Sequence, residues 1–364
     1  MPGFISILLC LSLLFSVTVW GESWSDQKPA AKTEKKQGSS VGHLVATKRV
    51  SLPSEIGGGV DEPLTCDDDG NIYLQSEHHG VSGVRKLSPK GERIAVFQPN
   101  ANPDLQIDLV GYFAVTASGE LYQLVFPHEI TRYVFVFQSD GTYKSAIKLE
   151  PGFAWQPSTM AVFPSGNMLI SGLKHDQDRK NSVMWPFAGI FGSDGTLLKE
   201  VKLEDDGAIH DMAQSADPRV SSFTNPSANR AIEFSKMQAG GDGNIYLMRW
   251  LTPAIFYAIS PGGEAVRRFT VDPGDKEFQP EEMHVSGNKI AVLFFQPQTK
   301  ETRMKVVDLE GRELATYDTV QVEGRPNPEP LGVAFACYTA NPERFIFLGA
   351  GDDNKLEFLI AEPH

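Results

Sequence analysis

The chain has 364 residues, of which 41% are hydrophobic and 22% are charged, a profile typical of a globular protein. Its formal net charge of −13 argues against nucleic acid as a partner, because phosphate binding needs clustered Lys and Arg. A G-x-S-x-G pattern occurs as "GSSVG" at Gly38 to Gly42, but it lies in a polar run and not at a strand-to-helix turn, so it does not indicate a nucleophile elbow. No H-E-x-x-H or phosphate-cradling Gly-Lys motif occurs, so the commonest sequence signatures of zinc proteases and nucleotide-binding proteins are absent.

Residues 1–21 predict a secretory signal peptide. The stretch from Phe4 to Trp20, "FISILLCLSLLFSVTVW", carries no charge, and the chain becomes polar directly after it. Gly21, with Val19 two residues before it, fits a cleavage site. An uncleaved membrane anchor is the alternative, because the segment before Phe4 has no Lys or Arg. We therefore expect a secreted or periplasmic protein, with membrane attachment only if this segment is retained.

Residues 22–42 predict a flexible tether before the folded domain at 43–364. The run "SWSDQKPAAKTEKKQGSSVG" is lysine-rich and has few apolar residues, so ordering it would bury too little surface to offset the lost entropy.

A short phrase is repeated along the domain. "DDDGNIYLQ" at Asp67 to Gln75 recurs as "GGDGNIYLM" at Gly240 to Met248, with looser copies around Gly119, Gly166 and Gly287. Each copy combines residues that tolerate positive φ with an alternating apolar run, which predicts a turn leading into a β-strand. A second turn phrase follows each copy, with its glycine at Gly91, Gly141, Gly195, Gly263 or Gly311.

The spacing of these phrases predicts the fold. First-phrase glycines are 49, 47, 77 and 44 residues apart, and second-phrase glycines are 50, 54, 68 and 48 apart. A period of about 50 residues with four strands per unit is typical of propeller blades. Five units are explicit, and three C-terminal strands with the segment Leu44–Glu55 make a sixth. We predict an all-β, six-bladed propeller of four-stranded antiparallel blades, with the last blade closed by an N-terminal strand.

The phrases "DDDGNIYL" and "GGDGNIYL", each followed by a "P-x-G-E" or "S-D-G-T" type of turn, resemble NHL repeats. NHL proteins belong with the six-bladed propellers that include gluconolactonase-like and strictosidine-synthase-like enzymes. The resemblance covers residues 44–363 and implies the blade, whereas none of the family's catalytic signatures can be placed on this chain. Fold alone does not assign the function.

Strand alternation divides the domain into two faces. The repeated glycine turns connect strands A–B and C–D of each blade and lie at one end, which we call the turn face. The B–C loops and the D–A links between blades lie at the other end, the loop face, and irregular loops on a rigid scaffold are where binding sites usually occur. The sequence places most of its histidines and its remaining tryptophans there: His78, His79, His128, Trp155, His175, Trp185, His210 and Trp250.

Two readings of these residues stay open. Three histidines from separate blades could hold a zinc-type ion, or they could be loop residues that never meet. The tryptophans could stack on a ligand, or they could pack between blades.

A second set of candidates lies where the inner strands begin, around the central channel. Oxygen ligands there would suit calcium, as the resemblance to lactonase-type propellers implies, and the alternative is a set of solvated polar residues lining a channel. The channel-mouth candidates are Glu62, Gln156, Glu233, Gln279 and Glu281. For a divalent metal, zinc or calcium, the candidate ligands across both sets are His128, His175, Glu62 and Glu233.

Two further features stand out. Cys66 and Cys337 fall on inner strands of the first and last units, which are ring neighbours, so they form either a disulfide or, the reading we favour, two buried free thiols. The insertion Glu204–Arg230 breaks the strand pattern on the loop face and is longer than an ordinary link, which favours a role as a lid, with a mobile surface loop as the alternative.

Our leading hypothesis is an exported, non-enzymatic and monomeric propeller that binds a protein or a small ligand on its loop face. The alternative is a metal-dependent, lactonase-like hydrolase or lyase that uses the same face or the channel mouth. A third reading, a cell-surface scaffold on its tether, applies if the signal segment is retained.

Overall fold

The computed structural model describes residues 41–53, 56, 60–78, 81–128, 131–175, 184–214, 226–332, 334–350 and 355–364. The predicted signal peptide, nearly all of the predicted tether and His79 lie outside these residues. Within the described ranges, no helix combines the length and apolar character needed to cross a membrane.

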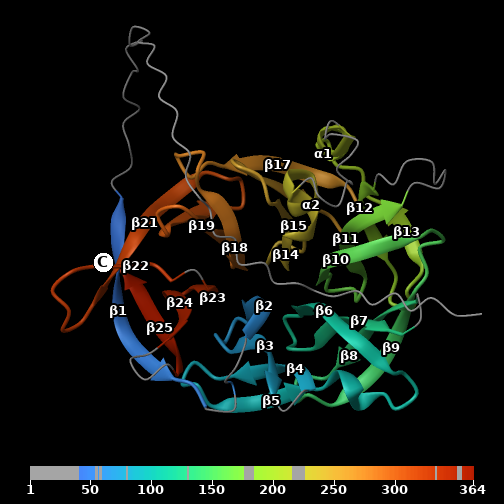
Figure 1. The fold of residues 1–364 in the computed structure, drawn as a ribbon, viewed down its shortest axis with the longest axis horizontal. Coiled ribbons are helices and arrows are strands. Elements are labelled where there is room, and N and C mark those ends of the chain that lie inside the picture. The colour runs from blue at the N-terminus through green and yellow to red at the C-terminus, as the bar shows by residue number, and fades with distance from the viewer. Residues whose placement is uncertain are drawn as a thin grey trace, which may run out of the picture. The chain divides into compact units, whose positions relative to one another are not determined.

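Four separate four-stranded sheets follow one another along the chain (Figure 1). The first contains β2 (Val60–Cys66), β3 (Ile72–His78), β4 (Val81–Leu87) and β5 (Arg93–Phe97), followed by a short 3-10 helix, η2 (Pro99–Ala101). The second contains β6 (Ile107–Val115), β7 (Leu121–Pro127), β8 (Arg132–Phe137) and β9 (Tyr143–Leu149).

The third and fourth sheets are separated by a helix pair. The third contains β10 (Trp155–Val162), β11 (Met168–His175), β12 (Met184–Phe191) and β13 (Leu197–Glu200). Helices α1 (Asp206–Gln214) and α2 (Pro226–Glu233) follow. The fourth contains β14 (Lys236–Ala239), β15 (Ile245–Arg249), β16 (Ala254–Ile259) and β17 (Ala265–Val271). Each sheet is antiparallel and pairs its strands in chain order.

The remaining strands form one nine-stranded sheet. Its first part contains β18 (Gln279–Ser286), β19 (Lys289–Gln296), β20 (Glu301–Asp308) and β21 (Glu313–Val322), with the two-residue β22 (Glu329–Pro330) beside β21. Its second part contains β23 (Ala334–Ala340), β24 (Glu343–Ala350), β25 (Leu356–Pro363) and β1 (Gly42–Ser51). The N-terminal strand β1 thus pairs antiparallel with the C-terminal strand β25.

The expectation of six separate blades is therefore met only in part, because a parallel pairing of β1 with β21 joins the last two groups. The reason lies in β21, which has ten residues. Its first half pairs with β20, and its second half leaves that partner and pairs with residues Gly42 to Ala46 of β1. The pairing satisfies backbone groups that would otherwise form an open sheet edge.

The sheets are arranged around a central axis as in a propeller, with β2, β6, β10, β14, β18 and β23 innermost (Figure 1). The core is divided into apolar clusters that lie between neighbouring four-stranded groups. One cluster joins the first and second sheets through Phe97, Phe135 and Phe137, and another joins β1 and β25 to the first sheet through Val50 and Leu74. Burial between successive sheets thus continues around the ring and across its closure.

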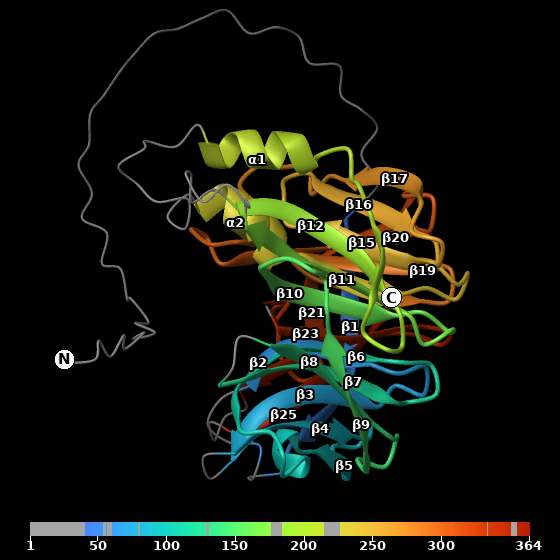
Figure 2. The same cartoon turned by 90° about the vertical axis from the view of Figure 1, so that its right-hand side faces the viewer.

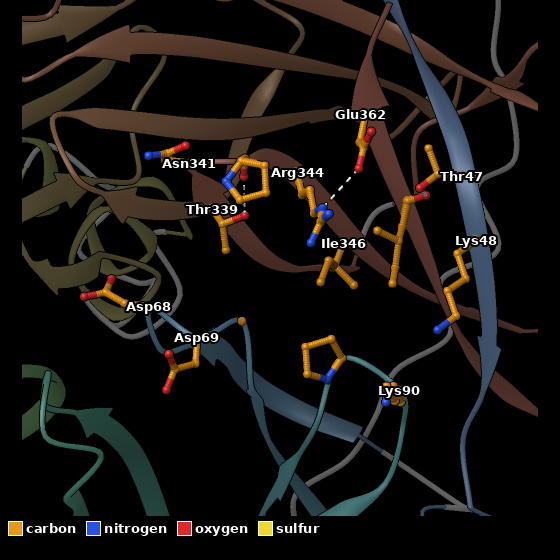
Figure 3. Close-up of a pocket in the computed structure, with 14 residues that line it drawn as sticks. Thr47, Lys48, Asp68, Asp69, Lys90, Thr339, Asn341, Arg344, Ile346 and Glu362 are labelled. Carbon is orange, nitrogen blue, oxygen red and sulfur yellow. Dashed lines mark hydrogen bonds and ion pairs between the residues drawn. The ribbon is translucent and has the colours of Figure 1, made fainter.

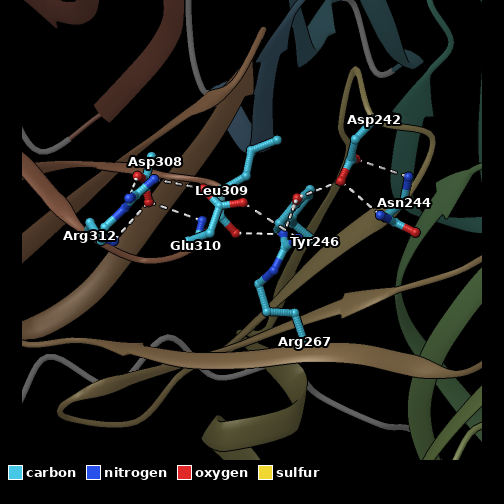
Figure 4. A network of polar contacts seen from close by, with 8 residues as sticks. All are labelled: Asp242, Asn244, Tyr246, Arg267, Asp308, Leu309, Glu310 and Arg312. Carbon is cyan, nitrogen blue, oxygen red and sulfur yellow. Dashed lines mark hydrogen bonds and ion pairs between the residues drawn. The ribbon is translucent and has the colours of Figure 1, made fainter.

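The repeated phrase is a turn whose side chains hold it in place. All ten phrase glycines have positive φ, between 57° and 91°. In the copy at Gly243, Asp242 accepts hydrogen bonds from the Asn244 backbone and side-chain amides and from the Tyr246 hydroxyl, at 2.8–3.1 Å (Figure 4). Arg267 donates to the Tyr246 hydroxyl and to the Leu309 carbonyl, which ties this turn to the next group.

The copy at Gly70 also combines an Asp, an Asn and a Tyr, but its Asp stands at another position relative to the glycine. Asp67, three residues before the glycine, accepts from Asn71 and from the Tyr73 hydroxyl, and Lys86 lies 3.1 Å from its carboxylate. These contacts explain why Asn and Tyr recur at the same distances from Gly70 and Gly243: in these two copies the side chains fix the turn at the entrance to a strand.

Candidate functional site

The inner strands carry β-bulges near the middle of their length. The pairing register shifts between Pro157 and Thr159 in β10 and between Pro280 and Glu282 in β18, with similar shifts in β2, β6 and β23. A bulge adds one residue to a strand and re-aims the next side chain. Proline is favoured at bulges because it cannot donate a hydrogen bond to the neighbouring strand.

Residues at three of these bulges, together with the first residue of β14, form a polar layer across the channel. Tyr112, Thr159, Lys236 and Glu282 come from the neighbouring strands β6, β10, β14 and β18. The last three are 0%, 3% and 6% exposed. Lys236 Nζ lies 3.0 Å from Glu282 Oε2, and Glu282 Oε1 accepts from the Met283 backbone amide at 3.0 Å. We call these four residues the channel layer.

The electrostatics of the channel layer disfavour further charge. Burial and the nearby Glu282 carboxylate raise the pKa of Tyr112 to about 12, so its phenol is neutral at physiological pH. Thr159 is fully buried, and its interaction with the Tyr112 side chain opposes part of that rise in pKa. His284, two residues beyond Glu282, is buried and lies against the Phe335 carbonyl, with Nε2 3.0 Å from that oxygen. Burial lowers the pKa of His284 to about 4, so this imidazole is also neutral.

The predicted insertion forms the helix pair α1 and α2 on the loop face (Figure 2). From the sequence we expected a lid or a surface loop here, without helices. Ile209 of α1 and Ala231 and Ile232 of α2 are buried against Leu173 and Met184 of the third sheet. The described ends of the insertion are thus packed onto the blades.

A buried arginine anchors the first helix. Arg249, at the end of β15, is 0% exposed, and its Nη2 lies 2.8 Å from Asp206 Oδ1. Its Nε lies 3.7 Å from Asp205 Oδ2, and Asp205 also accepts from the Tyr257 hydroxyl at 2.5 Å. Burial raises the pKa of Asp206, and the arginine opposes that rise. The start of α1 is therefore fixed by charge pairs that have little contact with water.

Aromatic side chains surround the helix pair. The ring of Trp185 stacks on that of His210, with centroids 3.2 Å apart and planes at 14°. Trp185 is 36% exposed, whereas His210 is buried. In the last turn of α2, the Arg230 guanidinium lies 5.7 Å from the ring centroid of Trp250, and the ring centroid of Phe234, directly after the helix, lies 5.8 Å from that of Trp250. We call Trp185, Arg230, Phe234 and Trp250 the cap surface.

The histidines predicted to converge occupy different environments. The His128 side chain is 86% exposed, and its Nδ1 lies 2.9 Å from Asp108 Oδ2. His175 ends β11 and is exposed, while His210 is buried under Trp185. The side chain of His78 is outside the described set. Across the described ranges, no three His, Cys, Asp or Glu side chains are grouped as metal ligands.

Trp155 belongs to the core. It is 8% exposed, stacks on Phe191 at 5.3 Å between centroids, and meets Phe187 edge-on at 5.4 Å. It therefore follows the packing alternative, whereas Trp185 and Trp250 lie on the cap surface.

Most of the channel-mouth candidates lie within a few residues of the channel layer in the sequence, but their side chains are more exposed than those of Thr159, Lys236 and Glu282. Gln156 is exposed at the start of β10, and Gln279 and Glu281 are partly exposed on β18. Glu233 ends α2 and not an inner strand, and partial burial raises its pKa. The Glu62 side chain is not among those described. A bulge shifts the inward and outward alternation of a strand by one residue, so counting without it selects a neighbour of the residue that is buried in the channel layer. Pro157 and Pro280 were the local sequence signs of these two bulges.

The two cysteines form a disulfide between β2 and β23, so the free-thiol reading that we favoured from the sequence is wrong. Cys66 and Cys337 are separated by 271 residues, and their Cα atoms are 5.3 Å apart. The bridge lies between the first sheet and the C-terminal strands, at the closure of the ring.

No protein-family model and no curated protein matches the chain. Among solved structures, it is similar to the PQQ-bound aldose sugar dehydrogenase of Streptomyces coelicolor, with TM-score 0.44 and 10% identity over 89% of this chain and 98% of that one. It is also similar to a protein of unknown function from Bacteroides caccae, with TM-score 0.43 and 12% identity over 70% and 80%. A third is the Dos1 propeller, with TM-score 0.41 and 10% identity over 80% and 75%. These neighbours include β-propeller proteins, and the likeness concerns the fold alone.

Proposed function

We propose that this protein is an exported six-bladed β-propeller that binds a partner protein through the cap surface on its loop face. The observation that carries the proposal is the cap surface itself. It presents Trp185 and Phe234, 36% and 45% exposed, beside an exposed Arg230 that lies over Trp250.

The composition of this surface suits protein recognition. Trp, Phe and Arg are enriched in protein interfaces and dominate their binding energy. Large exposed apolar residues elsewhere, such as Leu198 and Val266, occur singly on outer strands and need no functional explanation. The residues of the cap surface lie on or beside the helix pair instead: Trp185 stacks on His210 of α1, and Arg230 and Phe234 at the end of α2 contact Trp250. The apolar cluster beneath holds both helices, and Arg249 also holds the start of α1.

Six blades are the count that the packing supports. The glycine of each C–D turn contacts the outer strand of the preceding group, as Gly141 does at Val96 and Gly311 does at Phe269. Gly91 of the first sheet makes the corresponding contact with Val50 of β1. In this reading β1 is the outer strand of a sixth blade, and its parallel pairing with β21 is an addition to the propeller.

Export is supported by two independent features. The uncharged segment Phe4–Trp20 is typical of a signal peptide, and a disulfide between distant residues is typical of oxidising compartments. Attachment to a membrane would follow if the segment is not removed.

A metal-dependent lactonase-like hydrolase or lyase is the second candidate. The channel layer favours it, because a buried Lys236–Glu282 pair beside a neutral Tyr112 brings acid–base groups together on the inner strands. A stoichiometric divalent metal in the purified protein, measured by elemental mass spectrometry and lost on Glu282→Gln, would move the assignment to this reading. The loop-face metal reading would predict loss on the double variant His128→Ala/His175→Ala instead.

Site-specific photo-crosslinking tests the binding proposal. A photoreactive residue at position 234 should give a discrete crosslinked partner in cells that make the protein, whereas one at position 198 should not. Both positions carry exposed apolar side chains, so exposure alone is matched. Equal crosslinking at both positions, or none at 234, would contradict the proposal.

A further inference from the structure

A cleft of about 500 Å³ opens on the turn face, where the first sheet meets the C-terminal strands (Figure 3). It is separate from the cap surface, which lies on the loop face. Its walls are the two turns of the first sheet, the turn between β23 and β24, and the middle of β1. From the sequence, the regularity of this face gave no reason to expect a site.

The disulfide fixes the distance between the two walls. Cys66 precedes the Asp68–Gly70 turn on one side, and Cys337 precedes Thr339 on the other. Thr339 Oγ1 also donates to the Pro342 carbonyl at 2.8 Å, which closes the second turn on itself. A cleft whose walls are covalently joined loses little freedom when a ligand binds.

Charges of opposite sign stand on different parts of the cleft. Asp68 and Asp69 belong to the first turn, whereas Lys48 and Lys90 come from β1 and the second turn, and Figure 3 shows the two pairs apart. All four are exposed, and within the described part of the chain none of their side chains forms an ion pair. By contrast, Arg344 in the same cleft lies 3.0 Å from Glu362.

The floor between these charges is apolar. Ile346 of β24 and Ile360 of β25 line it, and the rings of Pro89 and Pro342 flank it. A ligand that fits all three regions has a cationic group, an apolar middle and an anionic group in that order. The volume lies within the range of small-molecule sites.

We propose that this cleft binds a short peptide with free ends. Its terminal ammonium lies against Asp68 and Asp69, its carboxylate lies against Lys48 and Lys90, and its side chains contact the isoleucine floor. Capture of a terminal amine or carboxylate is a recurrent mode of peptide recognition. The site does not depend on the cap surface, so each can fail without the other.

Methyl NMR of the purified protein with trialanine as the probe tests this proposal. Free trialanine should shift the methyl resonances of Ile346 and Ile360 in a saturable manner. Acetylating its amine or amidating its carboxylate should each weaken binding by about threefold to tenfold, the range for partly exposed charge pairs.

Matched variants assign each end of the peptide. Asp68→Asn/Asp69→Asn should remove the preference for a free amine and keep the preference for a free carboxylate, and Lys48→Gln/Lys90→Gln should do the reverse. Lys300→Gln, at an exposed lysine in the β19–β20 turn, is the control and should change neither preference. The proposal is overturned if trialanine does not bind, or if blocking its ends has no effect on binding to the wild-type protein.

Discussion

At the scale of single residues, the repeated phrase is an economical solution to a backbone problem. Its glycine supplies the positive φ, and its Asn and Tyr return hydrogen bonds to a nearby Asp, which is Asp67 in one copy and Asp242 in another. The Asp occupies different positions in the two copies, because its carboxylate only has to reach the same Asn and Tyr donors. The glycine cannot move, since the turn hydrogen bond depends on its positive φ.

Gly195 and Gly166 distinguish two reasons for a glycine: a positive φ, and close packing against a neighbouring sheet. Both have a φ of 85°, but a Cβ at Gly195 would overlap the Lys148 carbonyl oxygen of the preceding sheet, whereas nothing lies within 4 Å at Gly166. Gly166→Ala should lower the free energy of unfolding by about 1–2 kcal/mol, the cost of the left-handed conformation. Gly195→Ala should cost about 1–3 kcal/mol more because of the overlap. Urea unfolding measures both, and equal losses would contradict the packing of this turn on its neighbour.

His284 predicts a defined loss of stability in acid. Its pKa falls from 6.5 to about 4 on folding, so the unfolded chain binds the proton more tightly. The stability it contributes is therefore complete above pH 6.5 and is lost as the pH falls toward 4, by about 3 kcal/mol in total. His284→Gln retains a donor for the Phe335 carbonyl and should flatten the free energy of unfolding over that range. The control His128→Gln, at an exposed histidine, should keep the wild-type slope.

At the scale of elements, the strands and turns were predictable from the sequence and the channel was not. Turn glycines and alternating strands follow local rules, so their positions could be counted. Glu282 and Thr159 are aimed by bulges, and a bulge depends on the pairing of two strands, of which only Pro157 and Pro280 gave a local sign. The helices in the insertion are short, and the start of α1 is held by Arg249, which lies after both helices in the chain.

Arg249 should be the main support of α1. Arg249→Met leaves Asp205 and Asp206 without their buried cation, which typically costs about 3–5 kcal/mol. Hydrogen exchange in α1 should accelerate together with the loss in global stability. The control Arg325→Met breaks an exposed pair with Glu329 and should cost at most about 1 kcal/mol. Unchanged exchange in α1 would show that the apolar cluster alone holds the helix.

At the scale of the whole molecule, the ring is closed twice between distant parts of the chain. β1 pairs with β25, and Cys66 is bonded to Cys337 across the same junction. The closing strand could be recognised from the sequence because Leu44–Glu55 resembles an outer strand. The oxidation state could not, since it depends on a Cα separation that spacing does not encode.

The disulfide should stabilise the closure measurably. Cys66→Ala/Cys337→Ala should lower the free energy of unfolding by about 2–5 kcal/mol, as for other native disulfides. Reductant should destabilise the wild-type protein to a similar extent and leave the variant unchanged. A reductant effect that persists in the variant would place the cause elsewhere.

The central claim is that the cap surface is the binding surface, and affinity for the partner recovered by crosslinking tests it most directly. Titration calorimetry would compare wild type with Trp185→Ala/Phe234→Ala and with the control Leu198→Ala/Val266→Ala, which removes exposed apolar residues from outer strands. We predict that the cap variant binds at least about 30-fold more weakly, as for interface hot spots, and that the control stays within about twofold. Equal affinity for all three proteins would contradict the claim.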